Sequence, residues 1–429
     1  MTTELSRLVA TYEASPESED HYHDLIRFAK EKIGSEDEDG QDQHIYVKAL
    51  ADAARSETGR KAIVDSDIVN HVGGCEWWVE EDQYLVQICR LGGNLCFDNP
   101  SGRSCVLLSG ILDKLANVIR ENLSNFSSSK LWQVLPSFLH NYCHENKGCL
   151  QSIKSIFLLS AKQFSCLEVS DENLDIVENY INFLSGILQH EGKQDLFEEQ
   201  QVSVCLIYLF EKFDYESAAL PLVEIFQELF ENEKLCKLYI DQKILDLVIK
   251  RSDGICKITD EEGEPIKDKF SEEVSTQCLD VLALISSHSS VLAEIQSDLT
   301  SIMTQWMTSP PTDHHLATAG IICGNICTSD SACLQLLTTN LPALLISHVH
   351  INSSAKVLHA VVGCLRNLAV CSSARDQLSE LGLVESASKM LVSLSQGKDH
   401  TVTPKLMSTL RLVTQVCVSL SNIIVILTQ

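Results

Sequence analysis

The glycine-containing stretch LGGNLCFDNPSGRS at residues 91–104 is the first place in this sequence where chemistry is conceivable. A phosphate-binding loop needs glycines spaced around a lysine and a Ser or Thr, with a strand before and a helix after. No lysine follows this stretch, and the residues before it do not have the pattern of a strand. The stretch therefore does not predict nucleotide binding.

Adjacent cysteine and histidine residues are the next candidates. Cys143 precedes His144, and His314 precedes His315. Consecutive side chains on a helix point about 100° apart, so neither pair has a geometry in which one residue activates the other. We expect no catalytic residue, and an enzyme with its own active site is disfavoured.

Seventeen cysteines raise the question of metal binding or disulfides. No Cys-x-x-Cys pair occurs, and the pairs Cys143/Cys149 and Cys323/Cys327 lack partner pairs at the spacing of zinc ligands. The first residues, MTTELSRLVATYEASPESED, have neither the basic start nor the apolar core of a signal peptide. We expect reduced thiols in a cytoplasmic protein, with no metal and no cofactor.

Acidic residues outnumber basic ones by 59 to 33, which gives a net charge of -26. Such a chain repels nucleic acid and anionic membrane surfaces, and a basic partner is its natural complement. The alternative is that the charge only maintains solubility. The most apolar run, VTQVCVSLSNIIVILTQ at 413–429, is interrupted by polar residues, so no stable membrane insertion is expected.

The sequence pattern around Asn94 recurs further along the chain. Its copies share apolar residues at i, i+3, i+4 and i+7, the pattern of a helix with one buried face, and each has an asparagine off that stripe. The copies are LVQICRLGGNLC (85–96), LATAGIICGNIC (316–327) and LHAVVGCLRNLA (358–369), aligned on Asn94, Asn325 and Asn367.

The residues after each copy repeat as well. A polar turn and an apolar segment lead to Gly110, Asn340 or Gly382, residues that tolerate the left-handed conformation and so predict a helix end. A further amphipathic helix follows, with Pro342 suited to a first turn. The unit is therefore three helices, and Asn325 to Asn367 spans 42 residues.

Weaker copies fill the remaining sequence and place Asn141, Gly186, Glu228 and Leu284 at the asparagine position. The spacings are 41 to 47 residues, except for a longer interval between Glu228 and Leu284. A three-helix period of this length is typical of armadillo repeats. Since such units bury their faces only by stacking, the sequence predicts an all-α, armadillo-repeat, right-handed superhelical solenoid.

The predicted boundaries follow from this period. We expect an acidic, partly mobile segment at 1–40, an array of about nine repeats at 41–415 and an apolar, atypical end at 416–429. The first and last copies are VKALADAARSETGRKAIV (47–64) and KLMSTLRLVTQ (405–415). The longer interval is taken up by an acidic loop insert at 252–273.

The third helix of an armadillo repeat lines the concave face, so the asparagines mark a candidate groove. Asn94, Asn141, Asn325 and Asn367 could hold a partner backbone, or each could bond to the neighbouring repeat and determine the stacking. Nearby carboxylates would make the groove acidic, although a merely solvated face is the alternative. These carboxylates are Asp98, Asp214, Glu216, Glu224, Glu228, Glu231 and Glu233.

Nuclear-import receptors also bind basic peptides in an armadillo groove. They use a tryptophan one turn before the asparagine, and here those places hold Arg90, Ser137, Ile321 and Gly363. Without these aromatic surfaces for lysine side chains, the import-receptor hypothesis is disfavoured.

Several segments resemble, in order, the repeats of the SmgGDS family of guanine nucleotide dissociation stimulators. They are GRSCVLLSGILDKLANVIR (102–120), HNYCHEN (140–146), ELFENEKLCKLYI (228–240), QWMTSPPTDHHLATAGIICGNICTSDSAC (305–333), CLRNLAV (364–370) and KLMSTLRLV (405–413). The resemblance implies a cytosolic protein that binds small GTPases of the Rho and Rap types with polybasic, prenylated or prenylatable C-termini, promotes GDP release and escorts the GTPase. An armadillo scaffold that binds basic peptides without exchange activity is the alternative.

The resemblance also assigns site residues. Asn325 matches a groove asparagine of the family, and Ser329 stands at the place of a second one. The family's acidic patch lies near Asp214 and Glu216, with Ser217 and Leu220 at two of its positions. Because the chain stops several repeats before family members do, the resemblance indicates a shortened form, for which binding of a basic tail is a safer expectation than exchange.

Overall fold

The computed structural model describes residues 3–15, 18–33, 43–75, 82–121, 130–168, 170–213, 216–253, 269–308, 312–350 and 353–396. Every regular element in these ranges is a helix. The chain divides into two compact units, Met1–Ile225 and Phe226–Gln429, and the boundary falls within α14 (Glu216–Phe230). The all-α prediction is confirmed.

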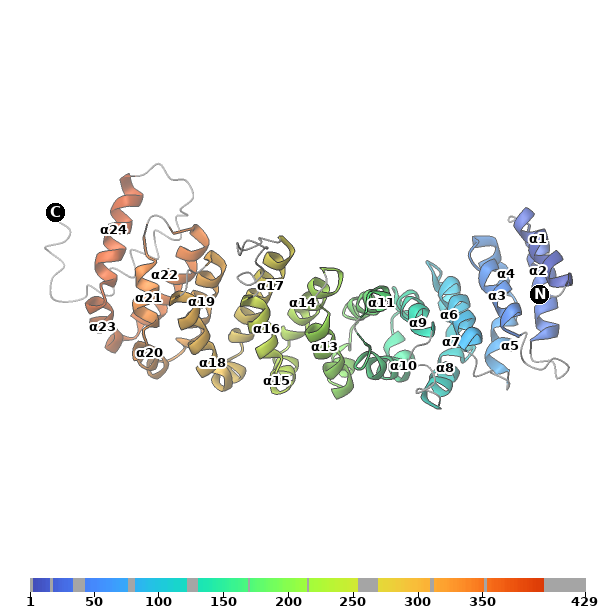
Figure 1. Ribbon diagram of the computed structural model, residues 1–429, viewed down its shortest axis with the longest axis horizontal. Coiled ribbons are helices and arrows are strands. Elements are labelled where there is room, and N and C mark those ends of the chain that lie inside the picture. Colours follow the sequence, from blue (N-terminus) through green and yellow to red (C-terminus); the bar gives the residue numbers. More distant parts are fainter. Residues whose placement is uncertain are drawn as a thin grey trace. The chain divides into compact units, whose positions relative to one another are not determined.

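The third helices predicted from the asparagine register are present in both units (Figure 1). In the first unit they are α3 (Gln43–Ala53), α6 (Asp82–Cys96), α9 (Leu131–Cys143) and α11 (Asp171–Ile187). In the second unit they are α17 (Lys269–Ser287), α19 (Asp313–Ile326) and α22 (Ala355–Val370). Within each unit, every one of these helices packs against the next. α14, which contains the register position Glu228, is a third helix that spans the boundary between the units.

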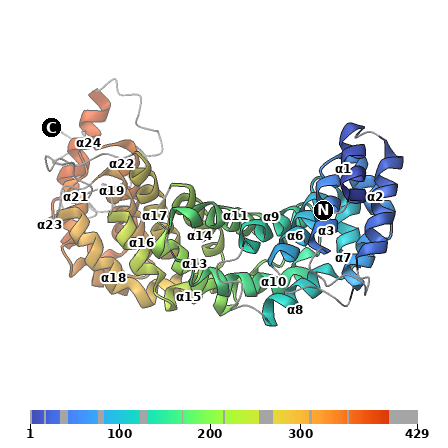
Figure 2. The same ribbon diagram turned by 45° about the vertical axis from the view of Figure 1, so that its right-hand side comes forward.

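The first and second helices of the repeats stand between them. In the first unit they are α1 (Thr3–Ala14), α2 (Glu19–Lys32), α4 (Glu57–Asp65), α5 (Ile68–Gly74), α7 (Pro100–Leu108), α8 (Ile111–Glu121), α12 (Gln194–Phe197) and α13 (Gln200–Lys212). In the second they are α15 (Glu233–Asp241), α16 (Ile244–Ser252), α20 (Asp330–Leu337), α21 (Leu341–Ser347), η3 (Ser372–Ala374), α23 (Arg375–Glu380) and α24 (Leu383–Gln396). Figure 2 shows the layering within each unit from a second direction. Stacked helical repeats of this kind form the armadillo fold.

Two repeats depart from the three-helix unit. Single helices, α10 (Cys149–Phe164) and α18 (Ser289–Thr308), replace a first and a second helix. α18 contacts both α15, a first helix, and α21, a second helix. Neither α10 nor α18 contains a glycine or proline, whereas Gly110 and Gly382 break the chain elsewhere with φ of 70° and 87°. The prediction of three helices is therefore wrong for these two repeats.

Two boundary predictions also differ from the structure. Asn340 has φ of -81° and is the N-cap of α21, so it begins a helix and does not end one in the left-handed region. The predicted loop insert reaches too far, because α17 begins at Lys269. Residues 254–268, the last predicted copy at 405–415 and the apolar end at 416–429 lie outside the described residues.

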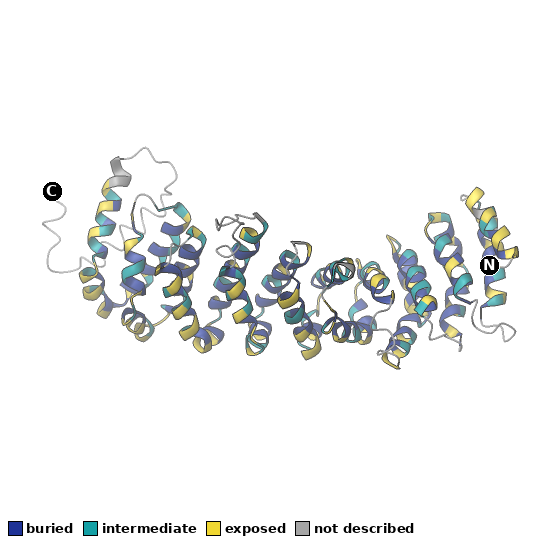
Figure 3. Cartoon of the chain, in the orientation of Figure 1, coloured by how far each residue is buried: buried dark blue, intermediate teal, exposed yellow. Residues whose placement is uncertain are grey.

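The predicted apolar stripes form the core of the array (Figure 3). In α22 all six stripe residues are buried, and in α6 the same is true. In the α19 copy Cys327 is only half-buried, since it follows the end of the helix. The leading segment joins this core through α1 and α2, which bury Leu5, Tyr22 and Leu25.

Among the described residues no single helix has the length and apolar character needed to cross a membrane. One bent pair, Ala355–Val370 with Ser372–Glu380, meets the test by length and composition only, with a bend of 109°.

Candidate partner-binding surface

The register asparagines of the first unit bond to the preceding third helix. Asn94 Nδ2 donates to the carbonyl of Ala51 at 2.8 Å, and Asn141 Nδ2 donates to the carbonyl of Gly93 at 3.2 Å. Both carbonyls lie in the last turn of their helices. The two side chains are half-buried.

The second unit repeats this contact. Asn367 Nδ2 donates to the carbonyl of Gly324 at 3.1 Å, the residue before the register position of α19. Asn325 Nδ2 donates to Ser286 Oγ at 2.8 Å, and this hydroxyl donates to the carbonyl of Ala283 at 2.7 Å. Ala283 precedes Leu284, the register position of α17, so the serine relays the same contact.

These bonds correspond to the stacking alternative considered for the asparagines. The donor end of each amide is engaged within the array, which leaves the amide oxygen as the group that a partner could use. The oxygen of Asn367 accepts from Arg366 Nη2 at 2.9 Å. A role of the four asparagines in partner binding stays a prediction.

Each third helix carries a solvent-facing stripe beside its register residue. The stripe consists of two positions on each helix, one turn and three turns before the register residue. The first of these positions is held by Arg90, Ser137, Asn182, Glu224, Asp280, Ile321 and Gly363. All seven are exposed or half-exposed, and none is a tryptophan.

Acidic residues gather on three of the third helices. α11 has four acidic residues and no basic residue, and α14 has three acidic residues and no basic residue. α17 has three acidic residues and one lysine. Asp175 of α11, Glu224 of α14, and Glu273 and Asp280 of α17 are exposed on the stripe. The acidic residues of α11 and α17 were not foreseen from the sequence. Counting one turn and three turns back from the register positions Gly186 and Leu284 would have found Asp175, Glu273 and Asp280.

The other third helices contain at most one acidic residue each. In α6, Arg90 Nη2 forms an ion pair with Asp52 Oδ1 of α3 at 2.7 Å, and both side chains are about two-thirds buried. α22 has Lys356 and Arg366 exposed and no acidic residue. The predicted acidity is thus a property of particular helices.

The predicted acidic residues occupy different surroundings. Asp98 is exposed, with φ of 47°, in the turn between α6 and α7. Asp214 lies outside the described residues, and Glu216 begins α14 but its side chain is not described. Glu224 is exposed, and Glu228, one turn later, is half-buried.

Ser329 has a structural role that the resemblance did not imply. It is the N-cap of α20, and its Oγ accepts from the N–H of Ala332 at 3.2 Å. The residue is exposed, so its surface position does not prevent contact with a partner. Glu233 begins α15, where hydrogen bonds from Ser290 lower the pKa of its carboxyl group.

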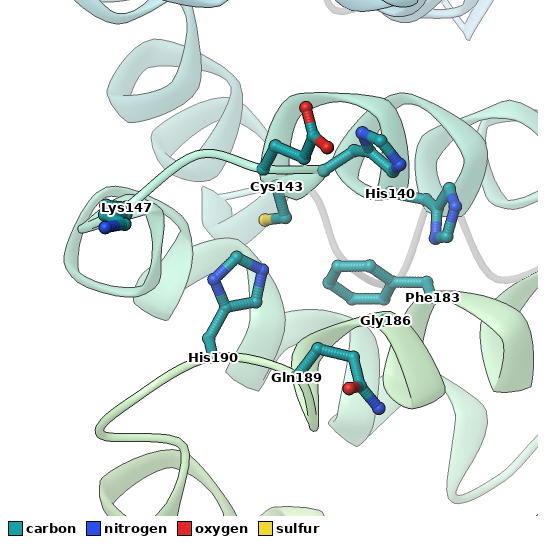
Figure 4. Close-up of a pocket in the computed structure, with 9 residues that line it drawn as sticks. His140, Cys143, Lys147, Phe183, Gly186, Gln189 and His190 are labelled. Carbon is teal, nitrogen blue, oxygen red and sulfur yellow. The ribbon is translucent and has the colours of Figure 1, made fainter.

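A cavity of about 550 Å³ opens at the ends of α9 and α11 (Figure 4). It is lined by His140, Cys143, His144, Glu145, Lys147, Phe183, Gly186, Gln189 and His190. Burial lowers the pKa of His140 and of His190, so both imidazoles are neutral at neutral pH.

Gly186, at the register position of α11, lies close to the ring of His140. A Cβ atom at that position would lie 3.0 Å from the His140 Nδ1. The described residues contain no group of three or more His, Cys, Asp or Glu side chains placed to hold a metal ion.

Comparison with known proteins finds similarity to two GTPase-GDP dissociation stimulators. The Rap1 GTPase-GDP dissociation stimulator 1-B of Xenopus laevis is 24% identical over 375 residues, 85% of this chain and 59% of that protein. The GTPase-GDP dissociation stimulator vimar of Drosophila melanogaster is 22% identical over 388 residues, 85% of this chain and 58% of that protein. These proteins are homologues of the chain. The resemblance to the SmgGDS family is confirmed.

The chain spans less than two thirds of the length of these relatives. No protein-family model matches it. Among solved structures, an engineered protein is similar over 97% of this chain and 99% of its own, with a TM-score of 0.52 and 16% identity. That likeness concerns the fold alone.

Proposed function

We propose that this chain binds small GTPases with polybasic, prenylated or prenylatable C-terminal tails, of the Rho and Rap type, stimulates their GDP/GTP exchange and escorts them in the cytoplasm. Its relatives are named for stimulating GDP dissociation from GTPases. The observation that carries the tail-binding part is the set of exposed carboxylates on the third-helix stripes of α11, α14 and α17.

The charge of the stripe suits a lysine-rich tail. Exposed carboxylates attract such a tail over a Debye length of about 8 to 10 Å at physiological salt, which speeds encounter more than it strengthens the final complex. Asp280 and Glu273 lie two turns apart on one face of α17, and Asp175 stands on the corresponding face of α11. A lysine-rich tail lying along α17 would meet both of its stripe carboxylates.

The register asparagines add polar contacts to this surface. With their N–H groups bonded to neighbouring helices, the oxygens of Asn94, Asn141 and Asn325 are held at one side-chain geometry. A fixed acceptor loses less conformational entropy on binding than a mobile one. These oxygens would accept from lysine ammonium or backbone N–H groups of the partner.

Exchange needs no chemistry from the chain. A protein accelerates nucleotide release if it binds the nucleotide-free GTPase more tightly than the GDP-bound form, because a ligand shifts an equilibrium only by its differential affinity. Asn325 and Ser329, the positions that match the family's groove, are the residues we assign to contact with the body of the GTPase.

The test is release of fluorescent GDP from Rho, Rac, Rap and Ras proteins, each with and without its basic tail. We expect faster release for the tailed forms and binding that weakens as salt is raised. Unchanged release from every GTPase, together with binding that ignores both salt and tail, would remove the proposal.

Charge reversals locate the surface. Glu224→Lys and Asp280→Lys should each weaken binding of a tailed GTPase by about three- to tenfold at low salt. Asp113→Lys on α8 and Asp246→Lys on α16 make the same change of charge at exposed positions of second helices. Equal losses in all four variants would mean that only net charge matters.

The acidic stripe equally favours the second candidate, an armadillo scaffold for basic peptides. In that case the tail-dependent and salt-sensitive binding would persist, while GDP release would stay at its basal rate. The same assay therefore separates the two functions.

A further inference from the structure

Two cysteines meet at the turn that joins α9 to α10. Cys143 is the last residue of α9 and Cys149 is the first residue of α10. Between them the chain reverses through two residues with left-handed backbone, Glu145 with φ of 52° and Gly148 with φ of 85°. The side chain of Asn146 holds the turn by donating to the carbonyl of Tyr142 at 3.0 Å. The reversal sets the two cysteines at its two ends, where each thiol shifts the pKa of the other.

A histidine stands beside this pair. The ring of His190 approaches the Cys149 sulfur at 3.9 Å from Nδ1 and at 4.0 Å from Nε2. The backbone of Cys143 partly offsets the effect of burial on the pKa of this imidazole. Because burial keeps the imidazole neutral, it is available to accept a proton.

The environment favours a thiolate at Cys149. The residue opens a 16-residue helix, where the free N–H groups and the helix dipole stabilise negative charge. The hydrogen bond from the Cys143 thiol is the largest cause of a lowered pKa at Cys149, and the same bond raises the pKa of Cys143. One thiol of the pair is thus the better nucleophile and the other keeps its proton.

The cavity provides access. Although both cysteines are buried, Cys143 and His190 line the cavity of about 550 Å³, and the Cys143 sulfur points toward the His190 ring (Figure 4). A small molecule can approach this wall, whereas other buried thiols such as Cys89 lie inside the core. The cavity is far larger than a small oxidant requires.

We propose that Cys143, Cys149 and His190 form an oxidation site at which a hydroperoxide converts the two thiols into a disulfide. The proposed GTPase-binding surface does not include these residues, so the oxidation site stands independently of the proposed function.

The reaction balances with hydrogen peroxide as the oxidant. His190 takes the proton of Cys149, and the thiolate attacks one peroxide oxygen, which breaks the O–O bond and releases hydroxide. The Cys143 thiol gives its proton to that hydroxide, forming water. Its thiolate then attacks the sulfur of the sulfenic acid and forms the S–S bond. The hydroxide displaced in this step takes the proton from His190 and becomes the second water.

The experiment treats the folded full chain with hydrogen peroxide and follows intact mass and peptide mass. We expect the protein to lose the mass of two hydrogens through a disulfide joining the Cys143 and Cys149 peptides, and a thiol reductant to restore it. The exposed Cys166 serves as an internal reference. Oxidation of Cys166 while Cys143 and Cys149 both stay free would overturn the proposal.

Variants separate the roles within the site. In Cys143→Ser, the Cys149 sulfenic acid should persist and react with a dimedone probe, and in Cys149→Ser the disulfide should be absent. His190→Asn should slow disulfide formation by about tenfold or more, the effect of losing a positioned proton acceptor. The control Cys89→Ser should leave the rate unchanged. Equal rates in His190→Asn and the unmodified chain would show that the imidazole takes no part.

Discussion

At the level of single residues, the register asparagines are first of all contacts between repeats. Asn141 reaches a carbonyl of α6 that already accepts a backbone hydrogen bond from Phe97 at 3.1 Å. A carbonyl has two lone pairs, so the two bonds are compatible. The asparagine therefore ties α9 to the C-terminal end of α6 through the second lone pair of this carbonyl.

Removing this amide should destabilise the first unit. Asn141→Ala should lower the free energy of unfolding by about 1 kcal/mol, the usual net value of one hydrogen bond. Asn141→Asp should cost more, because it sets a carboxylate oxygen against the Gly93 carbonyl. Urea unfolding measures both. The neighbouring exposed Ser137→Ala should stay within about 0.5 kcal/mol of the original, and a similar loss there would refute a specific bond.

A buried histidine makes stability depend on pH. Burial lowers the pKa of His315. Its ring packs edge-on against Trp306, with 5.1 Å between the ring centroids, and its Nδ1 hydrogen-bonds to the hydroxyl of Thr312. Since the folded pKa lies below the unfolded value of about 6.5, this group destabilises the fold as pH falls below 6.5 toward the folded pKa. In His315→Gln the free energy of unfolding should fall less steeply as the pH is lowered, by at most about 1.4 kcal/mol per pH unit. Parallel pH profiles of the two proteins would contradict this.

At the level of elements, close approach of third helices depends on missing side chains. A Cβ atom at Gly320 of α19 would lie 2.9 Å from the backbone of Ala360 and Val361 in α22. Backbone atoms of a packed helix do not move aside at low cost. Gly363 of α22 is different, because a Cβ there would meet nothing within 4 Å.

The two glycines should therefore respond to alanine with opposite signs. Gly320→Ala should lower the free energy of unfolding by about 1 to 3 kcal/mol, the usual cost of overpacking. Gly363→Ala should raise it by up to about 1 kcal/mol, since alanine is the better helix former. Denaturant unfolding of the matched pair decides the matter. Stabilisation by both substitutions would mean that α19 and α22 are less closely packed than described.

At the level of the whole molecule, the net charge of -26 acts on folding and on binding in opposite directions. Like charges repel one another in the folded chain, and salt screens that repulsion. The same screening weakens attraction for a basic tail.

Raising sodium chloride from about 0.05 to 0.5 M should therefore leave the free energy of unfolding unchanged or increase it, while the affinity for a tailed GTPase falls. Unfolding followed by circular dichroism and binding followed by fluorescence anisotropy, in the same buffers, give the two curves. A joint fall of stability and affinity would show that the lost binding reflects unfolding and not screening.

The armadillo architecture and the third helices follow from local sequence pattern. An apolar residue at i, i+3, i+4 and i+7 determines which face of a helix avoids water, and that rule needs no knowledge of neighbouring helices. For this reason the stripe residues of α6, α19 and α22 and the asparagine register were identified from sequence, and all but Cys327 are buried. The breaks at Gly110 and Gly382 follow equally from local backbone preference.

Contacts between repeats were decided by the tertiary structure. The partner of Asn141 is 48 residues away, and that of Asn325 is the serine of a relay, so both depend on where the carbonyl ends of packed helices fall. The fused helices α10 and α18, the exposed acids of α11 and α17, and the meeting of Cys143 with Cys149 were likewise not foreseen. Periodicity specifies which side of each helix is buried, while the atoms that meet across the stack depend on how far the helices are shifted and rotated against one another, a quantity that only packing determines.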